Sequence, residues 1–369
     1  MIYLDNGATS FRKPSAVYRA VADALRSCAN PGRGGYSAAM AAAGRIYGCR
    51  EAAAELFDCR PEQVVLTTSC THGLNIAIRS LAKPGSRVLI SGFEHNAVTR
   101  PLHGLGVKLT IAGRKLFDWD NMLSEWEAAL KRGQDAAFFT HVSNVFGYIL
   151  PVKEMARLCR QYGVPFAVDA AQSAGTLPVS LKDLGADFIA MPGHKGLLGP
   201  QGTGLLLCAG NGEPLLYGGT GSASLEQKMP EDLPDRLEPG TLNVPGFAGL
   251  REGLRYLNRV GVTSIGEREH RQLKGCISGL QKLGMRVFAG PHQASTVSFL
   301  PGLDCEEAAT ILAEQGIAVR AGLHCAPLAH ESAGTVGTGT VRVSLGWNTN
   351  DAEIYHFLRA ASKLSPFLK

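Results

Sequence analysis

The sequence lacks several features that mark large classes of protein. No apolar run approaches the roughly 18 residues that span a bilayer, and no block of lysine and arginine stands out within the net charge of +5. A membrane protein and a nucleic-acid-binding protein are therefore not expected. The first residues show no basic stretch followed by an apolar one, so no secretory signal is predicted. We expect a cytoplasmic chain.

Paired cysteines are also missing. The nine cysteines are scattered and no two form a C-x-x-C pair, a pattern typical of a reducing compartment rather than of a disulfide framework. No internal repeat or low-complexity tract is present. With 369 residues, of which 45% are hydrophobic and 19% charged, the chain has the size and composition of a soluble globular protein of about two domains.

Short apolar segments alternate with helical ones over the first 245 residues. Helices are predicted at 15–29, 38–57, 73–82 and 152–162, and strands at 63–67, 87–90, 135–141 and 164–169. This alternation predicts a mostly parallel sheet covered on both faces. Ligands bind at the carboxyl ends of such strands, where Thr71, Asn144, Asp169 and Lys195 fall.

The pattern changes near residue 245. Long helices are predicted at 249–261 and 265–283, followed by a strand at 295–299, a helix at 305–315 and a strand at 341–344. Such a mixture favours a smaller α+β unit. We predict a large domain at 14–245 and a small domain formed by 1–13 and 246–369.

One lysine stands out chemically. Lys195 lies in a glycine-rich run after the apolar segment 188–190, and Asp169 ends the apolar segment before it. A lysine can link covalently to pyridoxal 5'-phosphate (PLP), and a carboxylate can keep the pyridine nitrogen protonated. Taken singly, Lys195 is compatible with a solvated surface lysine and Asp169 with a helix N-cap. A P-loop pattern is absent. The pair in this order favours a PLP site.

Further motifs fit this interpretation. They are Y-L-D-N-G-A-T at 3–9, T-T-S-C-T-H-G-L-N at 67–75, E-H-N-A at 94–97, S-N-V-F-G at 143–147, V-D-A-A-Q at 168–172, R-L-E-P-G-T at 236–241, V-R-A-G-L-H-C-A-P at 319–327 and R-V-S-L at 342–345. The chain resembles the class V aminotransferase family of fold-type I PLP enzymes, within it the short-loop cysteine desulfurase and selenocysteine lyase group. The resemblance implies an α/β fold, with a mostly parallel seven-stranded sheet covered by helices and a smaller α+β C-terminal domain.

The resemblance also implies cofactor contacts. A Ser/Thr-rich turn that opens a helix offers backbone N–H groups to a phosphate, although many relatives have hydroxyl residues where Cys70 and Pro192 stand. His95 is expected over the cofactor ring, where it can relay protons. The implied contacts are Cys70, Thr71 and His194 at the phosphate, Asn144 at the ring hydroxyl or substrate, Asp169 at the pyridine nitrogen, Gln172 at the phenolic oxygen, Lys195 at the aldehyde, and Thr241 at the phosphate across a dimer interface.

The segment around Cys325 sets the implied reaction. The glycine-containing loop resembles that of the short-loop desulfurases, in which a thiolate takes sulfur as a persulfide. This loop, beside His324, is expected to expose the thiol and lower its pKa. The alternatives are a buried structural cysteine, or metal binding by His324, Cys325 and His330, for which no second Cys/His pair is present. Arg342 is expected to grip the substrate carboxylate, with Ala8, Asn144 and Arg320 as further substrate contacts.

The implied activity is that of a PLP-dependent cysteine desulfurase. Lys195, His95 and Cys325 are the expected catalytic residues, L-cysteine (or L-selenocysteine) the substrate, and a sulfur-acceptor protein the partner. A homodimer with a shared active site is expected. Selenocysteine lyase is one alternative, and a class V aminotransferase or another PLP lyase, which would not need Cys325, is a second. A non-enzymatic scaffold would tolerate loss of Lys195 or Asp169.

Overall fold

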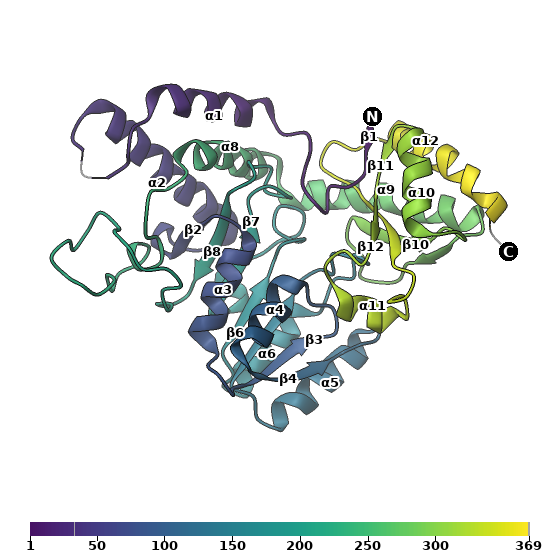
Figure 1. The fold of residues 1–369 in the computed structure, drawn as a ribbon, viewed down its shortest axis with the longest axis horizontal. Helices are drawn as coiled ribbons and strands as arrows, with labels where there is room; N and C mark the ends of the chain where they lie inside the picture. The colour runs from purple at the N-terminus through teal and green to yellow at the C-terminus, as the bar shows by residue number, and fades with distance from the viewer. Residues whose placement is uncertain (33, 368–369) are drawn as a thin grey trace.

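The computed structural model describes residues 1–32 and 34–367. Within them, seven strands form the main sheet in the order β2-β8-β7-β6-β5-β3-β4 (Figure 1). These are β2 (Val64–Thr67), β3 (Arg87–Ser91), β4 (Lys108–Ala112), β5 (Ala136–Thr140), β6 (Phe166–Asp169), β7 (Phe188–Pro192) and β8 (Gly204–Cys208). Only β8 runs antiparallel to its neighbours in this sheet. The mostly parallel seven-stranded sheet is confirmed.

Helices cover both faces of this sheet, and its central strands are therefore buried along their whole length. The helices are α1 (Ser15–Ser27), α2 (Ser37–Phe57), α3 (Cys70–Leu81), α4 (Asn96–Leu105), α5 (Trp119–Lys131), α6 (Val152–Gln161), α7 (Leu181–Leu184) and α8 (Val244–Val260). The strands and helices predicted before residue 245 are all present, with shifted ends. The sequence reasoning missed α4, α5, α7, β4 and β8.

A second, antiparallel sheet lies near the C-terminus, in the order β12-β13-β10-β9. Its strands are β9 (Arg286–Phe288), β10 (Thr296–Leu300), β12 (Arg320–Gly322) and β13 (Thr340–Ser344); a separate pair is formed by β1 (Ile2–Tyr3) and β11 (Ile317–Ala318). The other elements are α9 (Val262–Lys282), α10 (Cys305–Glu314), α11 (Pro327–Ala333), α12 (Asp351–Ala361) and three short 3₁₀ turns at Pro61–Gln63, Asp235–Leu237 and Ser362–Phe367. The N-terminal strand thus joins the C-terminal unit.

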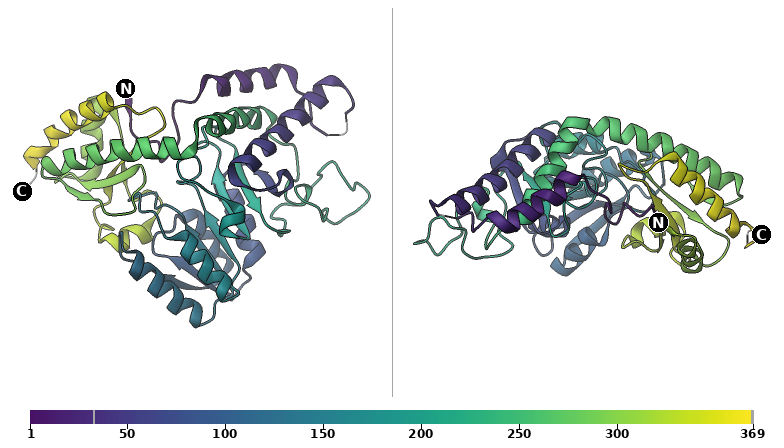
Figure 2. Two further views of the ribbon diagram at one scale, coloured as in Figure 1. Left: turned by 180° about the vertical axis from the view of Figure 1, so that it is seen from behind. Right: turned by 90° about the horizontal axis from the view of Figure 1, so that it is seen from above.

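The long helix α9 runs from one sheet to the other (Figure 2). Leu254 of α8 packs in the core of the large sheet, whereas Leu273 of α9 packs in the C-terminal core together with Leu4. The start of α9 therefore lies where the two units meet. Helix α8 packs on α1 and α2. The domain boundary near residue 245 stays a prediction.

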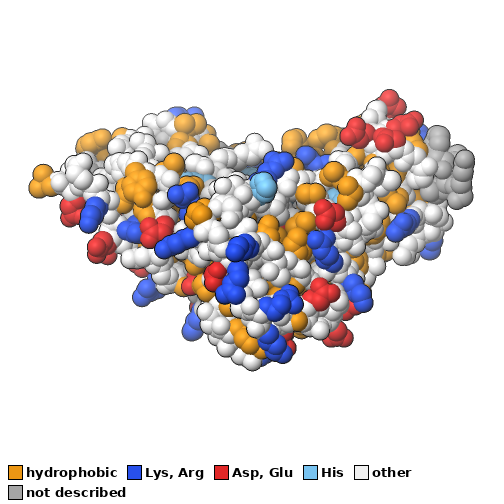
Figure 3. Space-filling model, turned by 60° about the horizontal axis from the view of Figure 1, so that its bottom comes forward, with side chains coloured by type: hydrophobic (Ala, Val, Ile, Leu, Met, Phe, Trp, Pro, Cys, Tyr) orange, Lys and Arg blue, Asp and Glu red, His pale blue; other side chains and the backbone are white. Residues whose placement is uncertain are grey.

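The surface carries charges of both signs. On the face drawn in Figure 3, lysine and arginine side chains are interspersed with aspartate and glutamate. No helix in the described part of the chain is long and apolar enough to cross a membrane.

Candidate active site

A cavity opens where β5, β6 and β7 end at their carboxyl ends, and we call it the strand-end cavity. It is lined by Ser69, Cys70, Thr71, His95, Ala97, Thr140, Val142, Asn144, Asp169, Ala171, Gln172, Pro192, His194 and Lys195. The fold therefore brings together every predicted cofactor contact except Thr241. Parallel strands and short connections produce this convergence, because their carboxyl ends share one edge of the sheet.

Asp169 is the buried anion of the cavity. Its Oδ1 accepts hydrogen bonds from the backbone N–H of Ala171 at 2.9 Å and from the thiol of Cys70 at 3.5 Å. Burial and the neighbouring Asp169 raise the pKa of the Cys70 thiol well above its usual value, so the thiol stays protonated and donates. Cys70 thus orients the carboxylate.

The glycines beside Lys195 allow close packing of the main chain. A Cβ at Gly193 would lie 2.1 Å from Thr203 Oγ1, and one at Gly196 would lie 2.3 Å from the carbonyl oxygen of Ala174. This packing fixes the backbone that presents Lys195 to the cavity. Burial lowers the pKa of the Lys195 ammonium, while Asp169 opposes the shift. A lysine of lowered pKa is the better nucleophile toward a carbonyl.

His95 caps the helix that follows it. Its Nδ1 accepts the backbone N–H of Ala97 at 3.0 Å, so the neutral ring carries its proton on Nε2. Burial lowers the pKa of His95, and Asp169 partly opposes this. The imidazole is therefore neutral near pH 7 and can exchange a proton through Nε2.

The start of α3 is arranged to receive an anion. Ser69 caps the helix by accepting the N–H of His72 at 3.2 Å, and Cys70 and Thr71 form the first turn. A Cβ at Gly204 would lie 2.6 Å from the Ser69 carbonyl carbon, which shows how closely β8 supports this turn. N–H groups of a first turn and the helix dipole favour a phosphate.

The N-terminal segment crosses the rim of the strand-end cavity. The side-chain amide of Gln172 donates to the carbonyl oxygen of Gly7 at 3.0 Å, and His194 Nδ1 lies 3.0 Å from Thr9 Oγ1. Burial, followed by Lys195, lowers the pKa of His194 to about 4, so its ring is neutral. The segment that follows β1 thus extends from the C-terminal unit to two of the predicted cofactor contacts, Gln172 and His194.

These groups fit PLP. The cavity offers a primary amine for the aldehyde, a buried carboxylate for the pyridine nitrogen, an imidazole for the ring face and a helix start for the phosphate. Lys195, Asp169, His95 and the Cys70–Thr71 turn would hold the cofactor. Bound there, PLP would supply an acceptor for electrons from the substrate Cα.

Cys325 lies outside the strand-end cavity, on an exposed loop. His324 and Cys325 both adopt left-handed backbone conformations, with φ of 49° and 56°, which non-glycine residues rarely adopt. The Cys325 carbonyl oxygen accepts the Asn96 N–H at 2.8 Å, and that of His324 accepts the Asn144 side-chain amide at 2.7 Å. Two parts of the cavity wall therefore hold the loop.

The His324 side chain faces the interior of the protein. Its ring is buried, with Nε2 lying 3.2 Å from the Thr340 carbonyl oxygen. Burial, followed by the charge of Arg342, lowers the pKa of His324 to about 2. A neutral ring that faces the interior supplies no positive charge to the Cys325 thiol, so this histidine supports the loop from within.

Both arginines that were predicted to contact the substrate bind Asp5. Arg342 Nη2 donates to Asp5 Oδ1 at 2.7 Å, and Arg320 Nη2 donates to Oδ2 at 2.9 Å. Arg342 is buried, and its Nη1 donates to the carbonyl oxygen of Asn144 at 3.0 Å while its Nε has no partner. Through Asn144, the pair of arginines is linked to the wall of the strand-end cavity.

Two predicted residues lie elsewhere. Thr241 is exposed and lines a separate groove between α2 and the segment 219–242. Ala8 lies in the turn after Asp5, whose carbonyl oxygen accepts its N–H at 3.1 Å. Neither residue lines the strand-end cavity.

Sequence reasoning missed two acids at this site. Asp5 was available within the Y-L-D-N-G-A-T motif, but no residue pattern indicated its arginine partners more than 300 positions away. Glu94, which precedes His95 in the sequence, is fully buried. It accepts hydrogen bonds from Ser91 at 2.5 Å and Thr140 N at 2.9 Å, and burial raises its pKa to about 8. The adjacent E-H-N-A motif was the available signal.

Comparison with known proteins gives one consistent result. The model of the aminotransferase class-V family matches residues 2–357. A probable cysteine desulfurase of Methanothermobacter thermautotrophicus is 33% identical over 96% of this chain and 92% of that relative, and one of Pyrococcus abyssi is 32% identical over 100% and 95%. The apo structure of a cysteine desulfurase from Thermococcus onnurineus superposes with a TM-score of 0.90, at 33% identity, over 100% of this chain and 95% of that one.

The chain belongs to the aminotransferase class-V family. It is thereby a PLP-dependent enzyme, and the predicted family and cofactor are confirmed.

Proposed function

We propose that this enzyme is a cysteine desulfurase, which converts L-cysteine to L-alanine and takes the sulfur onto Cys325 as a persulfide. The observation that carries the proposal is the exposed Cys325 thiol on a loop whose backbone is bonded to Asn144 and to the start of α4. The names of the full-length relatives support it.

The chain's own residues suit this reaction. Arg342 and Arg320 hold the substrate carboxylate, and the Lys195 amine removes the Cα proton. The Cys325 thiolate attacks the substrate sulfur, so that an S–S bond forms while the Cβ–S bond breaks. The electron pair of the broken bond stays with carbon, which takes a proton and becomes the methyl group of alanine. The outer sulfur of the persulfide then passes to a sulfur-acceptor protein in the cytoplasm, and the Cys325 thiol is regenerated.

The proposal includes a homodimer with a shared site. Large apolar side chains are exposed on α1, on α2 and on the segment 209–243, which lie together at one end of the molecule (Figure 1). They are Tyr18, Leu25, Tyr36, Met40, Tyr47, Leu216, Tyr217 and Leu225. Such a patch favours a protein–protein interface, and Thr241 in the neighbouring groove would then reach the partner's phosphate.

The test uses single-turnover mass spectrometry. After one equivalent of L-cysteine, the proposal expects 32 Da of added sulfur on the Cys325 peptide and one equivalent of alanine. Cys325→Ala should retain PLP but lose sulfur release by about 10³-fold or more, as for a nucleophile acting within a unit. Cys28→Ala, which removes a half-buried cysteine at the end of α1, is the control.

Competing activities give other products. Selenide release from L-selenocysteine without sulfide from L-cysteine indicates a selenocysteine lyase. Amino-group transfer to a 2-oxo acid that survives Cys325→Ala indicates an aminotransferase. Either result would replace the proposed function.

A further inference from the structure

A second cavity adjoins the strand-end cavity on the side of α9, and we call it the interdomain cavity. The two share Ala171, Gln172 and Lys195 among their lining residues. The interdomain cavity has a volume of about 40 Å³, room for about three water molecules at roughly 10–15 Å³ each. Asn6, Ser10, Thr176, Ser295, Thr296 and Ser344 give it polar walls.

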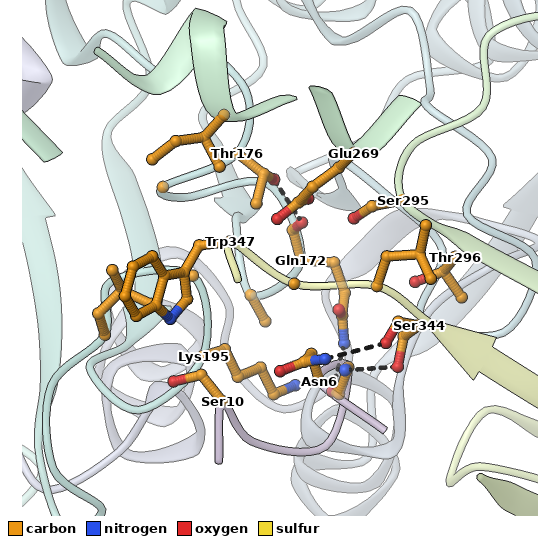
Figure 4. Close-up of a pocket in the computed structure, with 18 residues that line it drawn as sticks. Asn6, Ser10, Gln172, Thr176, Lys195, Glu269, Ser295, Thr296, Ser344 and Trp347 are labelled. Carbon is orange, nitrogen blue, oxygen red and sulfur yellow. Dashed lines mark hydrogen bonds between the residues drawn. The ribbon is translucent and has the colours of Figure 1, made fainter. Parts of the chain in front are cut away.

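Glu269 forms the wall opposite Lys195. In Figure 4 the two side chains lie at opposite ends of the cavity, with Gln172 between them. Glu269 is 1% exposed, and its Oε2 has no hydrogen-bond partner. A buried carboxylate oxygen without a partner is costly, and water in a polar cavity is the group that can satisfy it.

The sequence places Glu269 there through a glycine. A Cβ at Gly266 would lie 2.2 Å from the carbonyl oxygen of Thr176, so this glycine lets α9 approach the large sheet's connections. Glu269 follows three residues later, on the same face of the helix. Close approach at Gly266 therefore directs Glu269 into the cavity.

A third cavity leads from Glu269 outward, and we call it the outer cavity. It has a volume of about 350 Å³ and shares Thr176, Glu269 and Ser295 with the interdomain cavity. His270, His292 and the exposed Glu267 lie on its walls. The three cavities thus adjoin one another in series, and Glu269 lies between the cavity that contains Lys195 and the outer cavity.

We propose that Glu269 exchanges protons between the Lys195 amine and solvent through water held in the interdomain cavity. When Lys195 carries the Cα proton as an ammonium, that proton passes through water to the Glu269 carboxylate. The amine and a neutral carboxyl group result, and the carboxyl releases its proton through the outer cavity. This role rests on the proposed function only in that Lys195 is the residue that takes the Cα proton.

The charges around Glu269 agree with this role. Lys195 and Glu269 are the only ionisable side chains among the described residues that line the interdomain cavity. Burial raises the pKa of Glu269 to about 7, although a hydrogen bond from Ser295 and the charge of Arg268 act to lower it. Burial lowers the pKa of Lys195. Their proton affinities approach each other, which permits transfer in either direction. His270 and His292 face the outer side only.

The test follows exchange of the Cα proton of L-alanine in D₂O by NMR, with the PLP-loaded enzyme between pH 6 and 9. Glu269→Gln should slow exchange about tenfold near pH 7, less than the roughly 10²–10⁴-fold of a directly acting acid or base. Glu269→Asp should restore part of the rate. Glu154→Gln, which removes an exposed carboxylate of α6 that lines none of the three cavities, should leave the profile unchanged.

A second measurement needs neither cofactor nor substrate. Infrared difference spectra of the apoprotein should show a protonated carboxyl band that titrates near pH 7, is absent from Glu269→Gln and persists in Glu94→Gln, which removes the other buried carboxyl of raised pKa near the site. Equal alanine exchange in Glu269→Gln and wild type, or a band that the substitution leaves in place, would overturn the proposal. Alanine exchange involves neither Cys325 nor sulfur, so failure of the desulfurase assignment is recognised separately, by the absence of a persulfide.

Discussion

The carboxylate of Asp5 accepts a 2.7 Å hydrogen bond from the buried guanidinium of Arg342. The two residues are far apart in sequence, and they meet because β1 pairs with β11 in the C-terminal unit. Asp5 therefore fixes the arginine that is expected to bind the substrate carboxylate.

Replacing Asp5 should affect both stability and substrate binding. Asp5→Asn leaves Arg342 charged and buried, which costs roughly 3–5 kcal/mol when one member of a buried pair is removed. Urea unfolding measures this loss. Asp23→Asn, which removes an exposed partner of Arg26, should cost no more than about 1 kcal/mol. Equal effects of the two substitutions would contradict the anchoring role of Asp5.

Lys195 should carry the cofactor. Borohydride reduction of PLP-loaded enzyme followed by peptide mapping is expected to place the pyridoxyl group on Lys195, and Lys195→Ala should lose the reducible chromophore. Lys182→Ala, at an exposed position of α7, is the control and should keep it. A pyridoxyl group on another lysine would refute the assignment.

Asp169 should be needed for Cα chemistry more than for PLP binding. Without its negative charge the pyridine nitrogen is not held protonated, so the ring accepts electrons poorly. Asp169→Asn is expected to slow solvent exchange at the substrate Cα by about 10²-fold or more. Cys70→Ala removes only a donor to Asp169 and should have a much smaller effect. Wild-type exchange in Asp169→Asn would exclude the role.

Glu94 should make stability depend on pH. Its pKa in the folded protein, about 8, lies above its ordinary value of 4.5. Its contribution to stability is therefore complete below about pH 4.5 and is lost as the pH rises through 8. Glu94→Gln should flatten the fall in unfolding free energy between pH 5 and 8, measured by urea titration. Glu154→Gln, exposed on α6, should leave the slope as in wild type.

His324 should not set the reactivity of Cys325. Because the neutral ring contacts Thr340 in the interior, His324→Gln is expected to lower the melting temperature while changing the rate of Cys325 alkylation at pH 7 by less than about twofold. Alkylation by iodoacetamide, followed by mass spectrometry, measures that rate. A much larger loss of alkylation in a folded variant would show instead that His324 activates the Cys325 thiol.

The sequence predicted the sheet because its strands are short, apolar and separated by helices. The runs Phe166–Asp169 and Phe188–Pro192 are recognisable as buried parallel strands from their composition alone. β4 was missed because its pattern K-L-T-I-A is half exposed. α4 was missed because it contains Pro101, which ordinarily argues against a helix interior.

The site was predictable where function depends on short motifs. Lys195, Asp169 and His95 each end or follow a strand, so their convergence follows from topology. The contacts of Asp5 with Arg320 and Arg342, and the position of Glu269 opposite Lys195, depend on packing between distant segments. No local pattern encodes such contacts. The orientation of His324 was missed for a related reason, since adjacency in sequence does not fix the direction of a side chain.

The left-handed backbone at His324 and Cys325 lowers the stability of the fold, but glycine, which would relieve that cost, has no thiol. Glycine adopts such φ values without a steric penalty, whereas other residues there cost roughly 1–3 kcal/mol each. A search for more heat-resistant variants of this enzyme would therefore favour glycine at position 325. Such a variant would be more stable but would lack the thiol that we propose as the sulfur carrier, so any such screen must also select for turnover.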